Sequence, residues 1–189
     1  MLLIAAVLVL LLVGVGGWAM SHPRAPSEVD SVSDGGPRPE LAPNQIRDWE
    51  ADVGNETVSA TTEASQGYED CSTVEHENAL TALGCDQALD ARYTAEDGDI
   101  TIDLVVLRMS DHAEALSAST ELDLDDFQFG HGRNVPETDR EMFIVDTRDG
   151  FIVALFFQMN TDLEPATVEP YLSEFTQDQE EIVQGWAEE

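Results

Sequence analysis

The first 20 residues of the chain form an uninterrupted apolar run, MLLIAAVLVLLLVGVGGWAM, without a charged side chain or a proline. At the rise of an α-helix this run would be about 30 Å long, which matches the hydrocarbon thickness of a bilayer. Trp18 stands where an interfacial aromatic belongs. We therefore expect residues 1–20 to form one transmembrane anchor. The alternative is a cleaved signal peptide, although the run lacks a basic start and a good small-residue cleavage site.

Residues 21–70 are mostly polar, and five of the eight prolines fall within 21 residues of this segment. Such a composition buries too little apolar surface to offset the entropy lost on ordering. We therefore expect a disordered tether rich in Pro, Ser and acidic residues. Ile46, Trp49 and Val53 are an exception, because their spacing predicts a short amphipathic helix that docks on the folded domain.

Four segments with a strand-like apolar pattern follow, and they are joined in pairs by an Asp-Gly dipeptide. The segments are Leu89–Ala95, Ile100–Met109, Met142–Thr147 and Phe151–Met159. Asp-Gly between such segments is typical of a type I′ turn, so the pattern predicts two β-hairpins. Residues 100–109 become apolar on both faces near their end, which indicates a central strand.

Helical patterns flank the hairpins. Ser72 and Glu75 match a capping box for a helix that ends at Gly84, and Ser110 would cap a second helix carrying Ala113, Leu116 and Ala118. The third predicted helix has an apolar stripe at helical spacing, formed by Val168, Leu172, Phe175, Ile182 and Trp186. Gln179 is the one polar residue at a position of this stripe.

The predicted element order is therefore α-ββα-ββα. We expect a small α+β domain over residues 71–189, with a four-stranded, mainly antiparallel sheet and helices on one face, preceded by one transmembrane helix.

The chain is strongly acidic, with 39 Asp and Glu against 8 basic residues and a net charge of −31. All of the basic residues are Arg. A surface of this sign repels phosphate, which excludes nucleic acid as a partner and disfavours docking on an anionic bilayer. Solubility in a salty environment accounts for the charge; capture of cations or of a basic partner is the alternative.

Cys71 and Cys85 bracket the first predicted helix without a C-x-x-C motif, so they do not indicate a zinc site. A helix over residues 73–83 would be about 16 Å long, whereas a disulfide needs Cα atoms within about 7 Å. The cap at Ser72 and the disulfide therefore exclude each other, and free thiols are the alternative. We expect the disulfide, with the helix starting near Glu77, because loop closure contributes about 3 kcal/mol and a cap about 1 kcal/mol.

No nucleophile, phosphate-binding or dinucleotide motif is present, so we expect no cofactor and favour a protein that is not an enzyme. The connection between the two hairpin units, residues 121–139, lacks periodicity, and long connections of this kind are often functional. Its candidate interaction residues are Phe127, Phe129, His131 and Arg133. Its acidic cluster resembles the start of a calcium loop but has Asp at place six and Gly at place twelve; it comprises Glu121, Asp123, Asp125 and Asp126.

The stretch Ala79–Asp99, ALTALGCDQALDARYTAEDGD, resembles uncharacterised membrane-anchored or secreted proteins of high-GC actinobacteria. The shared features are the Cys, the Ala-rich residues after it, the Tyr and the Asp-Gly hairpin. The resemblance implies an exported compartment and this type of fold, and it implies no activity.

The charges near the anchor and the cysteines disagree on orientation. Arg24, Arg38 and Arg47 follow the apolar run, and the positive-inside rule would place them in the cytoplasm. The cysteine pair and the Pro/Ser/Gly spacer favour export. We expect a single-pass membrane protein whose domain is extracytoplasmic and contacts an envelope protein; the alternative is a cation-binding sensor or an enzyme that uses the 121–139 loop.

The orientation can be tested with topology reporters fused after Glu189. A reporter that is active only outside the cytoplasm should be active in this fusion. Activity of only a cytoplasmic reporter would show that the three arginines after the apolar run decide the orientation.

Overall fold

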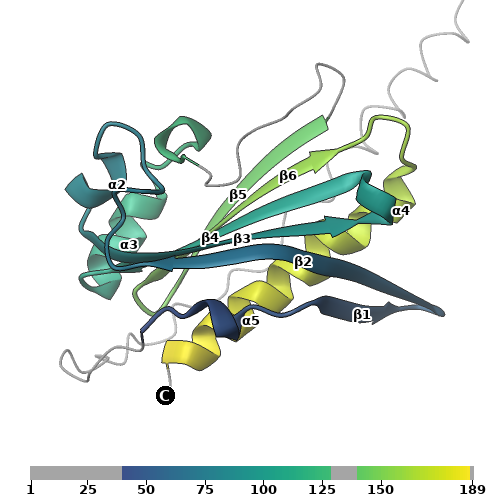
Figure 1. Ribbon diagram of the computed structural model, residues 1–189, viewed down its shortest axis with the longest axis horizontal. Helices are drawn as coiled ribbons and strands as arrows, with labels where there is room; N and C mark the ends of the chain where they lie inside the picture. The colour runs from purple at the N-terminus through teal and green to yellow at the C-terminus, as the bar shows by residue number, and fades with distance from the viewer. Residues whose placement is uncertain (1–39, 129–139, 188–189) are drawn as a thin grey trace, which may run out of the picture. The chain divides into compact units, whose positions relative to one another are not determined.

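A six-stranded, curled antiparallel sheet dominates the computed structural model, which describes residues 40–128 and 140–187 (Figure 1). Its strand order is β1-β2-β3-β4-β6-β5, and each neighbouring pair is antiparallel. The strands are Trp49–Val53 (β1), Glu56–Tyr68 (β2), Cys85–Ala95 (β3), Ile100–Met109 (β4), Arg140–Arg148 (β5) and Phe151–Met159 (β6).

The prediction of a four-stranded sheet is wrong because β1 and β2 form within the segment predicted to be a tether. β2 has few large apolar residues, and a register shift between Thr62 and Ala64 interrupts its alternation. Its stability as a strand comes from pairing with β1 on one side and β3 on the other. The predicted short helix at Ile46–Val53 is also replaced by β1, although Trp49 does dock on the core.

The prediction of helices on one face is wrong as well, since both faces of the sheet are covered (Figure 1). One face carries α2 (Ala79–Ala82), α3 (His112–Ser119) and the turn η3 (Leu124–Asp126). The other carries α4 (Pro165–Pro170), the π-helical η4 (Tyr171–Phe175) and α5 (Thr176–Ala187). Two further short turns are η1 (Pro43–Gln45) and η2 (Glu96–Gly98).

Both faces of the sheet must be covered because its central strands are apolar on both faces. All nine residues of β6 are buried, and β4 is buried along nearly its whole length. A strand that is apolar on both faces cannot leave either face to water. The predicted central position of residues 100–109 is confirmed, because β4 lies between β3 and β6.

Both predicted hairpins form. Asp149 and Gly150 have φ values of 47° and 91°, so this two-residue turn has the left-handed pair of a type I′ turn. The β3–β4 connection is wider, and Glu96, Asp97 and Gly98 all have positive φ.

The Cys71–Cys85 disulfide is present, with Cα atoms 6.1 Å apart. The helix between the two cysteines is reduced to the four residues of α2, and Ser72 does not cap it. Glu75 instead accepts hydrogen bonds from the backbone N–H of Thr81 at 2.7 Å and from its hydroxyl at 2.5 Å. The prediction that the disulfide forms and that the capping box at Ser72 is not used is thus confirmed.

The other two helices form, with shifts of one residue. Asp111 caps α3 in place of Ser110, and Leu116 is 54% exposed rather than buried. In the C-terminal helix Val168, Phe175 and Trp186 are buried as predicted, whereas Val183 is buried in place of Ile182, which is 40% exposed.

The predicted transmembrane helix at residues 1–20 lies outside the described residues. Among residues 40–128 and 140–187, none of the helices is long and apolar enough to cross a membrane.

Replacement of both cysteines, Cys71→Ala with Cys85→Ala, should lower the free energy of unfolding by about 3 kcal/mol, because the unfolded chain is no longer restricted by a closed loop of about 15 residues. Urea denaturation without reductant measures the difference. The double variant should not respond to reductant, whereas the wild type should lose a similar amount. Equal stability of the two proteins would contradict this role of the disulfide.

Candidate functional site

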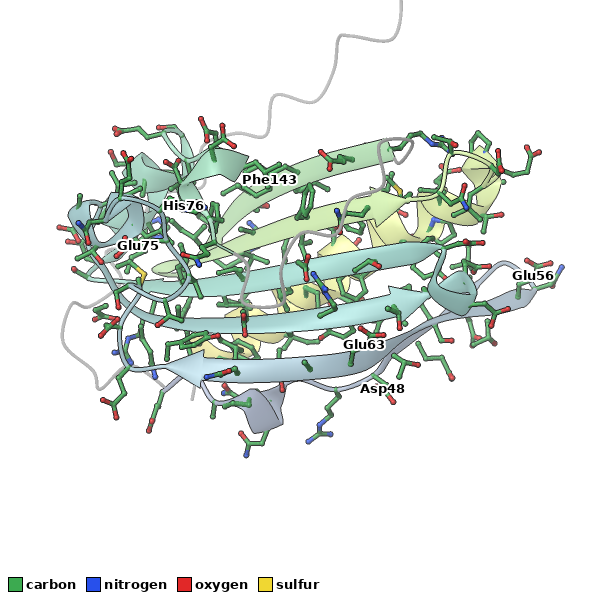
Figure 2. The ribbon with its side chains drawn as sticks, turned by 45° about the horizontal axis from the view of Figure 1, so that its top comes forward. Asp48, Glu56, Glu63, Glu75, His76 and Phe143 are labelled. Atoms are coloured by element: carbon green, nitrogen blue, oxygen red, sulfur yellow. A yellow bond between two sulfur atoms is a disulfide. The ribbon has the colours of Figure 1, made fainter. Side chains whose placement is uncertain are left out.

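Phe127 belongs to the core rather than to an exposed loop. Its side chain is 1% exposed, and its ring meets that of Phe143 edge-on with centroids 5.5 Å apart. Figure 2 shows Phe143 on β5, and Glu75, the bridge partner of Phe127, at the end of the sheet that α2 and α3 cover. The other predicted interaction residues, Phe129, His131 and Arg133, lie outside the described residues.

The acidic cluster before Phe127 caps its own turn. Asp126 accepts a hydrogen bond from the N–H of Asp123 at 2.8 Å, and Asp123 accepts one from the N–H of Asp125 at 2.8 Å. In the described part of the chain, no three His, Cys, Asp or Glu side chains are grouped so that they could hold a metal ion. The cluster therefore stabilises η3, and its geometry does not favour the cation sensor considered as an alternative.

A cleft of about 550 Å³ lies on the opposite face of the sheet, between the segment that enters β1 and helix α5. We call it the α5 cleft. Its lining combines aromatic, aliphatic, carboxamide and charged side chains. They are Asn44, Gln45, Ile46, Arg47, Asp48, Trp49, Tyr93, Gln179, Ile182 and Trp186.

The wall formed by residues 41–49 is held at both ends. At Leu41, the side chain of Gln87 accepts a hydrogen bond from the N–H at 3.0 Å and donates one to the carbonyl at 3.4 Å. The Asp48 carboxylate accepts from the N–H of Thr62 at 2.8 Å. Figure 2 shows Asp48 where the chain enters the β1–β2 hairpin.

Trp49 joins this wall to the helix across the cleft. Its indole N–H donates to the Asp178 carboxylate at 2.8 Å, and its ring packs on Tyr171 and Phe175 with centroids 5.7 and 5.3 Å apart. The width of the cleft is therefore fixed by contacts that exist without a ligand, which lowers the cost of ordering on binding.

Gln179 lies at the base of the cleft. The residue as a whole is only 3% exposed, and its side-chain amide makes no hydrogen bond with another described residue. The amide atoms themselves are not fully buried, so they keep contact with the solvent of the cleft. A ligand in the cleft could replace that solvent as donor and acceptor.

The aromatic walls remain uncharged at physiological pH. Burial raises the pKa of the Tyr93 hydroxyl to about 12. Trp186 is largely buried, and Ile182 stands exposed at the opening. The ionisable groups of the lining are Arg47, Asp48 and Tyr93.

The opening carries charges of both signs. Arg47 is exposed and makes no hydrogen bond or ion pair with described residues, while Asp48 beside it is held by Thr62. Asp178, one residue before Gln179, adds a second carboxylate. The immediate surroundings of the cleft thus carry one more negative than positive charge.

Comparison with protein-family models, with curated proteins and with solved structures finds no match. The function of this chain must therefore be inferred from its own geometry.

A buried ion pair on the other face has a structural role. Arg92 donates from two nitrogens to the Asp103 carboxylate, at 2.7 and 2.9 Å. These residues face each other on β3 and β4, and the Asp103 side chain is 3% exposed. Paired in this bidentate way, the two charges compensate each other and crosslink the two strands.

A further set of ion pairs joins β5 to α5. Arg148 forms ion pairs with Asp146, at 3.1 Å, and with Glu180. Burial and the neighbouring Asp146 carboxylate raise the pKa of Glu180 above its ordinary value of 4.5, and Arg148 only partly offsets them.

The interaction site predicted at Phe127, Phe129, His131 and Arg133 stays a prediction, because three of these residues lie outside the described part of the chain. The signal for the α5 cleft was present as the single polar residue, Gln179, in an otherwise apolar helical stripe. Trp49 in a polar segment was a second signal. Only the fold brings these two residues to one cleft.

Glu180 should make stability depend on pH. Because its folded pKa is raised, the folded chain binds more protons than the unfolded chain, so the contribution is complete below pH 4.5 and is lost as pH rises through the folded pKa. Relative to Glu180→Gln, the free energy of unfolding of the wild type should therefore fall over this range in a urea denaturation series. Asp146→Asn should lower the pKa of Glu180 measured by NMR. A difference that is flat or rises with pH would contradict this assignment.

Proposed function

We propose that residues 40–187 form a non-enzymatic binding module, held outside the cytoplasm by an N-terminal membrane anchor, that holds a segment of an envelope protein in the α5 cleft. The observation that carries the proposal is the carboxamide of Gln179, which lines this cleft and makes no hydrogen bond with another described residue.

Gln179 is poorly explained by folding alone. Its position in the buried stripe of α5 would suit Leu or Met, which would bury more apolar surface. A carboxamide that lines a cleft and is not used in the described part of the fold is available to a ligand. Its hydrogen bonds would be made to the ligand.

The cleft has the size of a ligand pocket, about 550 Å³, but it is open to solvent on one side and its lining is more polar than apolar. Such a lining suits a segment that brings polar groups as well as an apolar side chain. Hydrogen bonds with Gln87, Thr62 and Asp178 hold the wall in place: Gln87 and Asp178 accept from Leu41 and Trp49, and the N–H of Thr62 donates to Asp48. Because the wall is already ordered without a ligand, binding costs less conformational entropy.

The disulfide supports the location of the module. Cys71 and Cys85 are joined, and such bonds persist in oxidising compartments outside the cytoplasm. An anchor at residues 1–20 with the spacer that follows it would place the domain near envelope proteins.

Replacement of Gln179 by Leu separates binding from folding. Gln179→Leu should change the free energy of unfolding by less than about 1 kcal/mol, because the amide makes no hydrogen bond with another described residue that the substitution could remove. The probe is N-acetyl-phenylalaninamide, which offers an apolar ring and amide groups. In NMR titrations of the full chain, the indole N–H signals of Trp49 and Trp186 should shift saturably in the wild type and stay constant in Gln179→Leu.

Gln184→Leu is the matched control, since it makes the same chemical change on an exposed position of α5 outside the cleft. This variant should retain the wild-type shifts. A structural role for Gln179 would appear as a loss of more than about 1 kcal/mol of stability with unchanged shifts, and the proposal would then be wrong.

A further inference from the structure

We infer that the segment held in the α5 cleft is a basic peptide, with one apolar side chain inside the cleft and Arg or Lys residues on either side of it. This inference rests on the proposed function and adds the chemical class of the ligand.

The interior of the cleft selects an apolar group next to a peptide unit. Trp186, Tyr93 and Ile182 supply the apolar walls. Gln179 at the base, with Asn44 and Gln45 at the wall, supplies carboxamides. A carboxamide donates and accepts at once, so it is complementary to the N–H and C=O of a polypeptide backbone.

The surroundings of the cleft favour positive charge on the rest of the ligand. Asp48 and Asp178 outnumber Arg47 there. Farther away, Arg92, Arg108 and Arg148 are each paired with a carboxylate, so they do little to offset the excess of acids.

The whole chain has a net charge of −31, so its field attracts cations and repels anions. Basic residues beside the apolar anchor would enter this field, whereas a purely apolar ligand would not use it. An anionic lipid surface or an acidic peptide would be repelled.

The inference is tested with three fluorescein-labelled probes and the full-length chain in neutral detergent. The probes carry fluorescein on the N-terminal amine and have an amidated C-terminus; their sequences are Arg-Arg-Phe-Arg-Arg, Glu-Glu-Phe-Glu-Glu and Arg-Arg-Gly-Arg-Arg. Fluorescence anisotropy gives the dissociation constant of each. The basic Phe peptide should bind about 10-fold more tightly than the acidic Phe peptide at about 50 mM salt, and the ratio should shrink at about 500 mM salt.

The Gly peptide separates the cleft from general adhesion to an acidic surface. It should bind about 10-fold more weakly than the basic Phe peptide, because one buried aromatic anchor is missing. Gln179→Leu should weaken the basic Phe peptide about 10-fold and leave the Gly peptide unchanged, while Gln184→Leu should change neither.

Three results would overturn the inference: no binding of the basic Phe peptide, equal or tighter binding of the acidic peptide, or equal binding of the Gly peptide. An unchanged affinity in Gln179→Leu would overturn it too. The neutral probe N-acetyl-phenylalaninamide decides the proposed function separately, so a charge-independent cleft would appear as neutral binding without a preference for basic flanks.

Discussion

The burial of β4 and β6 on both faces is the constraint on which the rest of this domain depends. Two neighbouring strands without a solvent face require a layer of structure on each side. The segment between β4 and β5 supplies α3 and η3 for one face, and the segment after β6 supplies α4, η4 and α5 for the other. The three layers therefore follow from the composition of two strands at the centre of the sheet.

The α5 cleft is a product of this arrangement at the edge of the sheet. Toward β1 the sheet loses its large apolar side chains, and α5 extends over a region where the wall at residues 41–49 is the neighbouring element. Trp49 crosses the space between them and binds Asp178. The remaining opening is lined by the carboxamide of Gln179, which makes no hydrogen bond with another described residue.

The disulfide illustrates how a long-range bond overrides a local preference. Ser72 and Glu75 have the spacing of a capping box, yet the chain from Cys71 must return to Cys85 within 6.1 Å between Cα atoms. A long straight helix cannot satisfy this distance. Glu75 is then used differently, because its carboxylate binds Thr81 at the start of the shortened helix.

The sequence by itself determined β3, β4, β5 and β6, the two hairpins and the disulfide, because alternation, Asp-Gly turns and cysteine spacing act over short separations. It did not determine β1 and β2, whose small polar residues become strands only by pairing with β3. Nor did it determine that Phe127 is buried or that Ile182 is exposed, since these depend on the bridge to Glu75 and on which side of α5 packs against the sheet. Gln179 was visible as a polar residue in an apolar stripe, but only the tertiary structure places it opposite the wall at residues 41–49, more than a hundred residues away in the chain, and so turns an irregular stripe into a candidate binding site.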